Sequence, residues 1–204
     1  AGLAAVLALA IGVVLAFLRM MPQPWIRLPV TVLLEFFRGM PVLLMMLFIL
    51  LALATNGYWA VVWALAVYNG AIIGEALRAG IQSLPQGQRE AGLSLGLTPL
   101  QTRLSIEFPQ AFRQMLPIIL AQLVVLKDTS LAYVVAYPEI TRISNQLKDY
   151  YGSTRYSFSI FIVTLGIYLV VNFALSALAR WVAARSGPHR GELAELEAEV
   201  VDQG

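Results

Sequence analysis

Cysteine is absent from the 204-residue sequence, and its single histidine is His189. Disulfides and thiolate metal sites are therefore excluded, and one histidine leaves almost nothing from which to build a zinc site or a histidine-based triad. The chain also lacks a phosphate-binding loop of the form G-x-x-x-x-G-K-[ST], with which it would hydrolyse ATP unaided. We therefore predict no catalytic residue and no metal ligand, and no enzyme activity of the chain itself.

Charged residues are scarce as well. They make up 13% of the chain, whereas soluble domains average about 25%. Hydrophobic residues make up 59%. This balance predicts an integral membrane protein, and the formal net charge of +2 is too small to indicate a nucleic-acid partner.

Five apolar stretches are candidates for membrane spans, each of which takes roughly 20 mostly apolar residues in a helix. They are residues 2–18, 41–54, 59–77, 114–137 and 157–184, and residues 33–37 extend the second one backwards. We predict an all-α transmembrane domain at residues 1–184 with five spans, followed by a polar, acidic tail at 185–204. The first stretch lacks the basic start and the cleavage site of a signal peptide. Because the chain begins inside it, we expect the natural N-terminus to precede Ala1.

The distribution of basic residues predicts the orientation, because loops rich in Lys and Arg face the cytoplasm. With five spans, ten basic residues fall on the side of the polar loop at residues 83–113: Arg19, Arg27, Arg38, Arg78, Arg89, Arg103, Arg113, Arg180, Arg185 and Arg190. Three fall on the other side: Arg142, Lys148 and Arg155. We therefore predict a cytoplasmic loop at 83–113, an external N-terminus and a cytoplasmic C-terminus.

The polar loop at residues 83–113, called the island below, carries signals for folded structure. Ser83 is a candidate N-cap for a first helix, and Gly96 suits a helix end because glycine adopts a left-handed conformation at little cost. Thr98 and Gln101 then have the spacing of a capping box that starts a second helix. The island is thus predicted to be two short helices joined by a sharp turn.

Leucines recur at helical spacing along the island, at Leu93, Leu97, Leu100 and Leu104. They either pack the island against its own bundle or belong to a first helix that inserts into a groove on a cytoplasmic partner. In the second interpretation, the small residues Ala91 and Gly92 permit close approach of another backbone. Glu90 would then interact with a basic group or a helix N-terminus of the partner.

Several motifs resemble those of one transporter family. Glu90-Ala91-Gly92, then Gly96, then Phe108-Pro109-Gln110-Ala111 resembles the EAA loop of ABC importer permeases. Arg38-Gly39-Met40-Pro41, the stretch 69–81, Lys127-Asp128-Thr129-Ser130-Leu131 and Pro138-Glu139-Ile140-Thr141-Arg142 resemble motifs of the polar amino acid subfamily, which transports histidine, glutamate, glutamine, arginine or opines. The chain departs from the family pattern at Gly92 (usually Ala), Phe108 (usually Leu) and Met40 (usually Thr).

The resemblance implies a type I permease subunit of an ATP-driven importer of polar amino acids in a prokaryotic inner or plasma membrane. Its implied partners are cytoplasmic ATP-binding cassette subunits, a second permease (itself or a sister subunit), an extracellular or periplasmic amino-acid-binding protein, and membrane lipid. ATP and Mg would be bound by the ATPase subunits, and this chain would hold no cofactor. The implied ATPase-coupling residues are Glu90, Ala91, Gly92, Leu95 and Gly96.

Polar residues inside the spans are candidates for a substrate path. Ionised groups there cost roughly 2.5–3.5 kcal/mol each, which singles out Lys127 and Asp128. Adjacent residues on a helix point about 100° apart, so these two are poorly placed to pair with each other. Thr129 and Ser130 would add hydroxyl groups to the path. The alternative is a buried structural network that ends a broken helix.

Two further path candidates lie in the third predicted span. Glu75 is three residues before Arg78, a spacing that favours a local ion pair. Asn69 precedes a glycine, and we predict a local break there that faces a cavity. The external loop at 138–155 has the apolar spacing of a short amphipathic helix, which either lies at the membrane interface or forms a docking surface or outer gate.

Two other classes of function are also compatible with the sequence. One is an ion-driven secondary transporter that uses Asp128 and Glu75, and the other is a membrane scaffold whose island recruits a cytoplasmic enzyme. A secondary transporter usually has a longer chain with an internal repeat, and no repeat is visible in this sequence.

Overall fold

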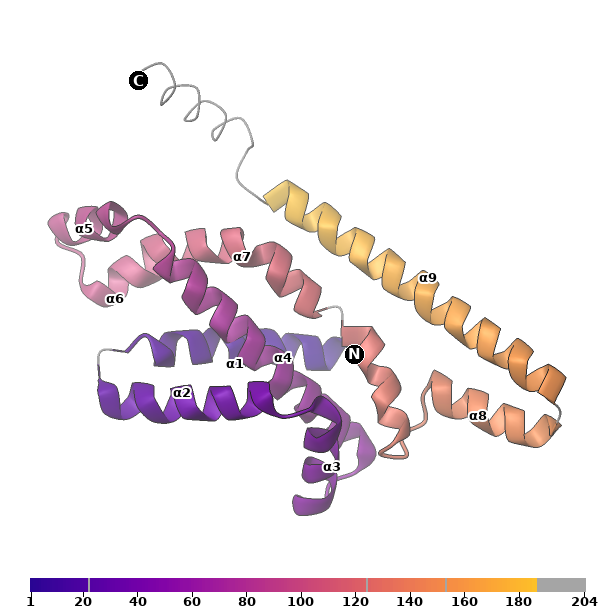
Figure 1. The fold of residues 1–204 in the computed structure, drawn as a ribbon. Helices are drawn as coiled ribbons and strands as arrows, with labels where there is room; N and C mark the ends of the chain where they lie inside the picture. Colours follow the sequence, from indigo (N-terminus) through magenta and orange to yellow (C-terminus); the bar gives the residue numbers. More distant parts are fainter. Residues whose placement is uncertain (22, 124, 153, 187–204) are drawn as a thin grey trace.

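The computed structural model describes residues 1–21, 23–123, 125–152 and 154–186, and every regular element in these ranges is a helix (Figure 1). The α-helices are α1 (Gly2–Arg19), α2 (Pro24–Gly39), α3 (Val42–Ala52), α4 (Gly57–Gln82), α5 (Gln86–Ser94), α6 (Pro99–Thr102), α7 (Phe108–Leu123), α8 (Ile140–Tyr151) and α9 (Thr154–Ser186). A π-helix, η1 (Arg103–Glu107), joins α6 to α7, and a 3-10 helix, η2 (Val125–Tyr133), follows α7. The predicted tail at 185–204 lies outside the described residues beyond Ser186.

Helix α4 is the centre of the fold, and it packs against α1, α3 and α7. Small residues bring α1 and α4 close together. A Cβ atom on Gly12 would lie 2.6 Å from Ile73 Cγ2, and one on Gly70 would lie 2.8 Å from Ile11 Cγ2. Since lipid tails are as apolar as leucine, membrane helices associate through such close contacts rather than through the hydrophobic effect.

The second predicted span is a bent pair of helices. The chain bends by 108° between α2 and α3. Pro41 has no backbone N–H and disfavours a helical conformation at the residue before it, and Met40 is accordingly extended (φ −83°, ψ 126°). α3 has 11 residues and is therefore about 16 Å long, which is shorter than the hydrocarbon core of a bilayer.

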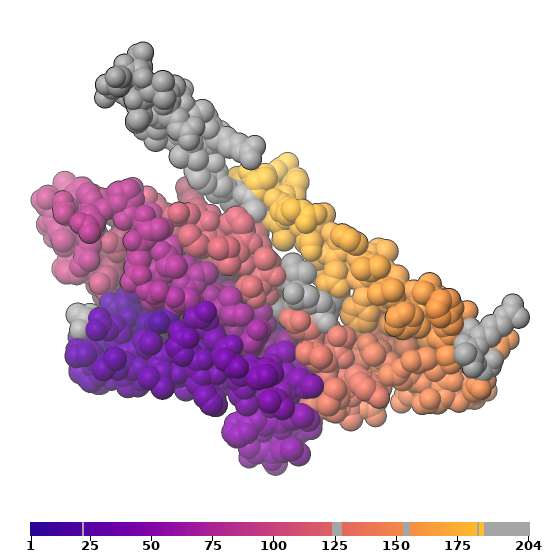
Figure 2. All heavy atoms as spheres, viewed as in Figure 1, coloured from indigo at the N-terminus to yellow at the C-terminus, as the bar shows by residue number. Residues whose placement is uncertain are grey.

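Helix α9 runs along the outside of the molecule, where it contacts α7 and α8 (Figures 1 and 2). Its stretch Tyr156–Val182 is apolar and has no buried residue. A long apolar helix with this exposure is suited to lipid or to another membrane helix.

Four helical segments are long and apolar enough to cross a membrane, and the number is five if the bent pair α2–α3 counts as one span. The prediction of an all-α membrane fold is thus confirmed, and its five spans require the bent pair to form the second one. The helical segment that contains the fourth predicted span begins before that span, because α6, η1, α7 and η2 form a nearly continuous helical segment from Pro99 to Tyr133.

Candidate functional site

The island folds into two helices, as predicted. α5 ends at Ser94, and Gly96 adopts a left-handed conformation with φ of +81°. The N–H groups of Gly96 and Leu97 donate to the carbonyls of Leu93 (3.0 Å) and Gly92 (3.2 Å), which is the Schellman pattern of helix ends.

The second island helix begins with the predicted capping box. The backbone N–H of Gln101 donates to Thr98 Oγ1, and Gln101 Oε1 accepts from the backbone N–H of Thr98 at 2.8 Å. The island is therefore a folded element rather than a loose loop, and it lies at the opposite end of the molecule from α8 (Figure 1).

Ser83 does not cap α5, contrary to our prediction. α4 continues to Gln82, so Ser83 is its C-cap residue in a helical conformation (φ −82°, ψ −10°), whereas an N-cap needs an extended one. Ser83 Oγ donates instead to the carbonyl of Gly80 at 2.8 Å. Pro85 occupies the N-cap position of α5, which has no side-chain cap.

The leucines of the island are largely exposed. Leu95 is 81% exposed, and Leu100 is 61% exposed. Leu93 and Leu104 are also exposed. The interpretation that the leucine stripe packs the island against its own bundle is therefore wrong for Leu93, Leu100 and Leu104, whereas Leu97 is half-buried. Exposed leucines on a folded element favour contact with another protein.

The implied coupling residues differ in their exposure to solvent. Glu90 and Ala91 are exposed, as is Gly96. Gly92 is buried, and a Cβ atom on it would lie 2.8 Å from Thr102 Cγ2 and 2.9 Å from Ile106 Cδ1. The close approach that Gly92 permits is thus to side chains of this chain, and not to a partner's backbone as predicted. This contact, which we call the Gly92 contact, packs α5 against α6 and η1.

The Gly92 contact gives a matched pair of variants within one helix. Gly87→Ala should be neutral or stabilise α5 by up to about 1 kcal/mol, because nothing lies within 4 Å of a Cβ atom there and alanine favours helix. Gly92→Ala should destabilise the Gly92 contact by about 1 kcal/mol, since Thr102 and Ile106 must move. Amide hydrogen exchange measures both, and faster exchange of α5 in Gly92→Ala alone is expected. Equal exchange in the two variants would contradict the Gly92 contact.

The second island helix leads directly into the fourth span. α6 passes into the π-helix η1 and then into α7, with helical backbone angles at both junctions. Arg103 Nη1 donates to the carbonyl of Met20 at 2.6 Å, which fastens η1 to the end of α1. π-helical turns inside helices are often found at functional sites. A displacement of α5 would therefore reach α7 through the Gly92 contact and η1.

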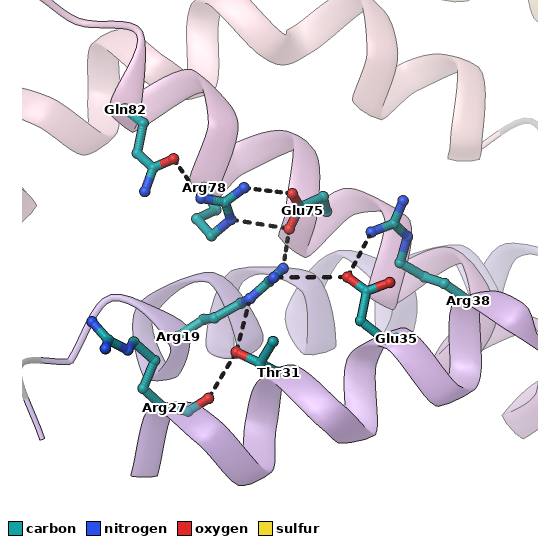
Figure 3. Close-up of polar contacts among 8 residues, drawn as sticks. All are labelled: Arg19, Arg27, Thr31, Glu35, Arg38, Glu75, Arg78 and Gln82. Carbon is teal, nitrogen blue, oxygen red and sulfur yellow. Dashed lines mark hydrogen bonds and ion pairs between the residues drawn. The ribbon is translucent and has the colours of Figure 1, made fainter. Parts of the chain in front are cut away.

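A cluster of ion pairs joins α1, α2 and α4 near the island (Figure 3). The predicted pair is present, because Arg78 donates to both carboxylate oxygens of Glu75, at 2.6 and 3.0 Å. Arg19 from α1 also pairs with Glu75. Glu35 lies 3.7 Å from Arg19 and 3.3 Å from Arg38. Sequence spacing could not reveal Arg19 as a partner of Glu75, because 56 residues separate the two.

The predicted helix break at Asn69 is wrong. α4 is continuous from Gly57 to Gln82, and Asn69 is 2% exposed, with Nδ2 donating to the carbonyl of Leu65 at 2.8 Å. The neighbouring Gly70 serves close packing against α1 and does not break the helix.

Four predicted path residues follow one another in η2, as Lys127, Asp128, Thr129 and Ser130. The side chain of Lys127 lies outside the described part of the chain. Asp128, Thr129 and Ser130 are half-buried, and each has an interaction partner. A 3-10 helix has about three residues per turn, so adjacent side chains here point about 120° apart rather than the predicted 100°.

A cavity of about 410 Å³ lies between α8 and α9, and Ser130, Phe161 and Leu165 are among its lining residues. Its other polar lining residues are Thr141, Ser144, Asn145, Lys148, Thr164, Tyr168 and Asn172. Hydrogen bonds join the two helices beside it: Tyr168 donates to Glu139 at 2.7 Å, and the hydroxyls of Ser144 and Thr164 lie 2.6 Å apart. The predicted amphipathic helix of the external loop is α8, and Glu139 caps its N-terminus.

Residues 8–187 match the family described as the binding-protein-dependent transport system inner membrane component. The chain belongs to this family. The permease is 38% identical to the glutamate transport system permease protein GluD of Corynebacterium glutamicum, over 98% of this chain and 76% of that protein. It is 35% identical to the probable glutamine ABC transporter permease protein GlnP of Bacillus subtilis, over 88% of this chain and 85% of that protein.

Solved structures agree with this assignment. The permease superposes on a chain of a crystal structure of an amino acid ABC transporter with histidines with a TM-score of 0.78, at 29% identity over 90% of this chain and 87% of that one. A MetNI methionine ABC transporter in an inward-facing conformation shares the fold (TM-score 0.72, 18% identity, 91% and 88% coverage). The resemblance to ABC importer permeases and the multi-pass membrane location are thus confirmed.

Proposed function

We propose that this chain is the membrane-spanning permease subunit of an ATP-driven importer of polar amino acids. The observation that carries the proposal is α5, a short helix with an exposed Glu90 and exposed leucines. Through the Gly92 contact it packs against α6 and η1, which lead into the fourth span. The amino acid permeases among its relatives support the substrate class. Glutamate and glutamine are the first substrates to test, followed by arginine and histidine.

Other subunits complete the proposed importer. The sequence has no phosphate-binding loop, so cytoplasmic ATP-binding cassette subunits would bind ATP and Mg and hydrolyse ATP. An external amino-acid-binding protein would deliver the substrate. The exposed apolar stretch of α9 offers a surface to lipid and to a second permease, which is either a second copy or a sister subunit. No nucleic acid is involved.

Within this proposal, residues 83–113 are the cytoplasmic coupling loop of a transmembrane domain at 1–184. The N-terminus is external and the C-terminus, with the tail at 185–204, is cytoplasmic. Closure of the ATPase subunits moves α5, and the Gly92 contact passes this motion to η1 and α7. Because packed elements switch between discrete arrangements, the spans then rock between inward- and outward-facing states.

The predicted path residues Glu75, Lys127, Asp128, Thr129 and Ser130 line the route of the amino acid in this proposal. Asn69, the sixth predicted path residue, is left out of it, because its side chain is buried and bonds to Leu65 of its own helix. The cavity between α8 and α9 supports a route beside η2, because Ser130 lines it. The cavity offers hydroxyl and amide groups of the kind that fix the orientation of a small polar ligand.

A variant of Asp128 tests the path separately from ATPase coupling. Asp128→Ala should lower uptake or change its selectivity among amino acids, because the carboxylate would no longer contribute to the path. Assembly with the ATPase subunits should be unchanged, since Asp128 lies in η2 and not in the island. Uptake of several labelled amino acids into vesicles measures this. Unchanged uptake and unchanged selectivity would remove Asp128 from the path.

The proposal as a whole is tested by reconstitution. The permease, its ATPase subunits and the binding protein are placed in vesicles, and uptake of each labelled amino acid is measured with ATP, without ATP and with an imposed ion gradient. ATP-dependent uptake that requires the binding protein is expected. Uptake driven by the ion gradient without ATP would instead support a secondary transporter, and no uptake under any condition would support a scaffold.

A further inference from the structure

A strongly basic cavity of about 490 Å³ lies between the end of α1, the start of α2, the end of α4 and the island. Its charged lining residues are Arg19, Arg27, Arg78, Arg89, Arg103 and Glu107. Guanidinium groups therefore outnumber carboxylates five to one in the lining. Arginine matches the geometry of phosphate oxygens, with planar groups of several N–H donors.

Part of this charge is already balanced outside the cavity. Arg19 and Arg78 share the carboxylate of Glu75 in the ion-pair cluster (Figure 3). The single negative charge of Glu75 offsets only part of their two positive charges, so the two arginines add a reduced share to the excess. Most of the excess comes from the other three arginines.

Arg27 and Arg89 are exposed, and neither guanidinium is in an ion pair among the described residues. Arg103 donates to the carbonyl of Met20, which does not neutralise its charge. The remaining carboxylate, Glu107, is 7% exposed and likewise forms no ion pair within the described chain. Three cations therefore face one anion across the cavity.

The start of α5 adds to the positive potential. Pro85 and Gln86 line the cavity at the N-terminus of this helix, which has neither a side-chain cap nor an acidic residue in its first turn. Backbone N–H groups at such an end are free for an anion, and the helix dipole favours negative charge there.

We propose that this cavity binds a phosphate group through Arg27, Arg89 and Arg103. Both an anionic phospholipid headgroup and soluble hydrogen phosphate carry this chemistry. Both also carry a hydroxyl that can donate a hydrogen bond to Glu107, as the glycerol of phosphatidylglycerol does. The cavity lies where the apolar helix α1 and the long helix α4 end, which is the depth of lipid headgroups, and basic pockets between membrane helices on the cytoplasmic side are suited to them.

The binding test uses the purified permease with its ATPase subunits in a neutral detergent. Native mass spectrometry measures retention of phosphatidylglycerol and of phosphatidylcholine, and inorganic phosphate is added as a competitor. We expect retention of phosphatidylglycerol over phosphatidylcholine. Arg27→Gln should weaken it about tenfold, because a charge-assisted hydrogen bond is lost, and Arg27→Lys should restore part of it. If inorganic phosphate at equal concentration displaces phosphatidylglycerol, the ligand of the cavity is the soluble anion. If it does not displace the lipid, the ligand is the lipid headgroup.

Arg113→Gln is the matched control, because it removes an exposed arginine of the island that does not line the cavity. The proposal is overturned if phosphatidylglycerol is not preferred and phosphate does not bind, or if Arg27→Gln and Arg113→Gln weaken retention equally. The cytoplasmic position of the cavity rests on the proposed function, but this readout does not require transport. Retention that depends on Arg27 in a protein without ATP-driven uptake would overturn the proposed function and leave the phosphate site standing.

Discussion

Glu90→Lys is expected to lower ATP-driven amino acid uptake at least about tenfold, because reversing a charge at the centre of the proposed contact with the ATPase subunits costs several kcal/mol. The fold should be unaffected. Glu90 is exposed, and its carboxylate forms no ion pair among the described residues, so the lysine breaks no interaction seen within the chain. Co-purification measures the contact with the ATPase subunits, vesicle uptake measures transport, and the melting temperature of the permease alone measures the stability of the fold.

The matched control for this variant is Asp149→Lys, which makes the same charge change at an exposed residue of α8, far from the island (Figure 1). It should leave co-purification with the ATPase subunits intact. Normal co-purification and normal uptake with Glu90→Lys would remove Glu90 from the coupling contact. A lowered melting temperature of the isolated permease would show instead that Glu90 serves the fold.

The island was largely predictable from sequence because its signals are local. A capping box at Thr98 and a left-handed glycine at Gly96 depend on residues within one turn, and both are present in the structure. The prediction for Ser83 was wrong because it also used only a local signal. Its residue type suits an N-cap, but α4 continues to Gln82 and makes Ser83 its C-cap, and helix boundaries are the least predictable feature of a helix.

The features that sequence did not reveal all depend on contacts between distant segments. Gly92 looked available to a partner, and its neighbours proved to be Thr102 and Ile106 of this chain. The basic cavity gathers arginines from α1, α2, α4, α5 and η1, so no single stretch of sequence contains its charge pattern. The counting of basic residues found an excess on this side of the protein, but counting cannot show that five of them meet.

The second large effect is expected from Glu75→Ala. The carboxylate of Glu75 lies between Arg19 and Arg78, whose side chains are 13% and 21% exposed. Its removal leaves two partly buried guanidinium groups without their shared anion, which should destabilise the permease by about 3 kcal/mol. The loss should appear as a lower melting temperature in detergent, and uptake should fall with it.

Glu35→Ala is the matched control within the same cluster. Glu35 is 55% exposed and lies 3.3 Å or more from its partners, so its loss should cost less than about 1 kcal/mol. Equal effects of the two variants would contradict a central role of Glu75 in the cluster.

Glu75→Gln separates the structural role from the predicted path role, because it keeps the shape of the side chain and removes the charge. If Glu75 only joins helices, Arg19→Met should reduce the effect of Glu75→Gln, since one of the two unbalanced cations is then gone. Selectivity among amino acids should stay unchanged in both variants. If Glu75 lines the path, selectivity should change in Glu75→Gln, and Arg19→Met should not restore it. The double-mutant cycle therefore decides whether this carboxylate stabilises the helix packing of the permease or lines the substrate path.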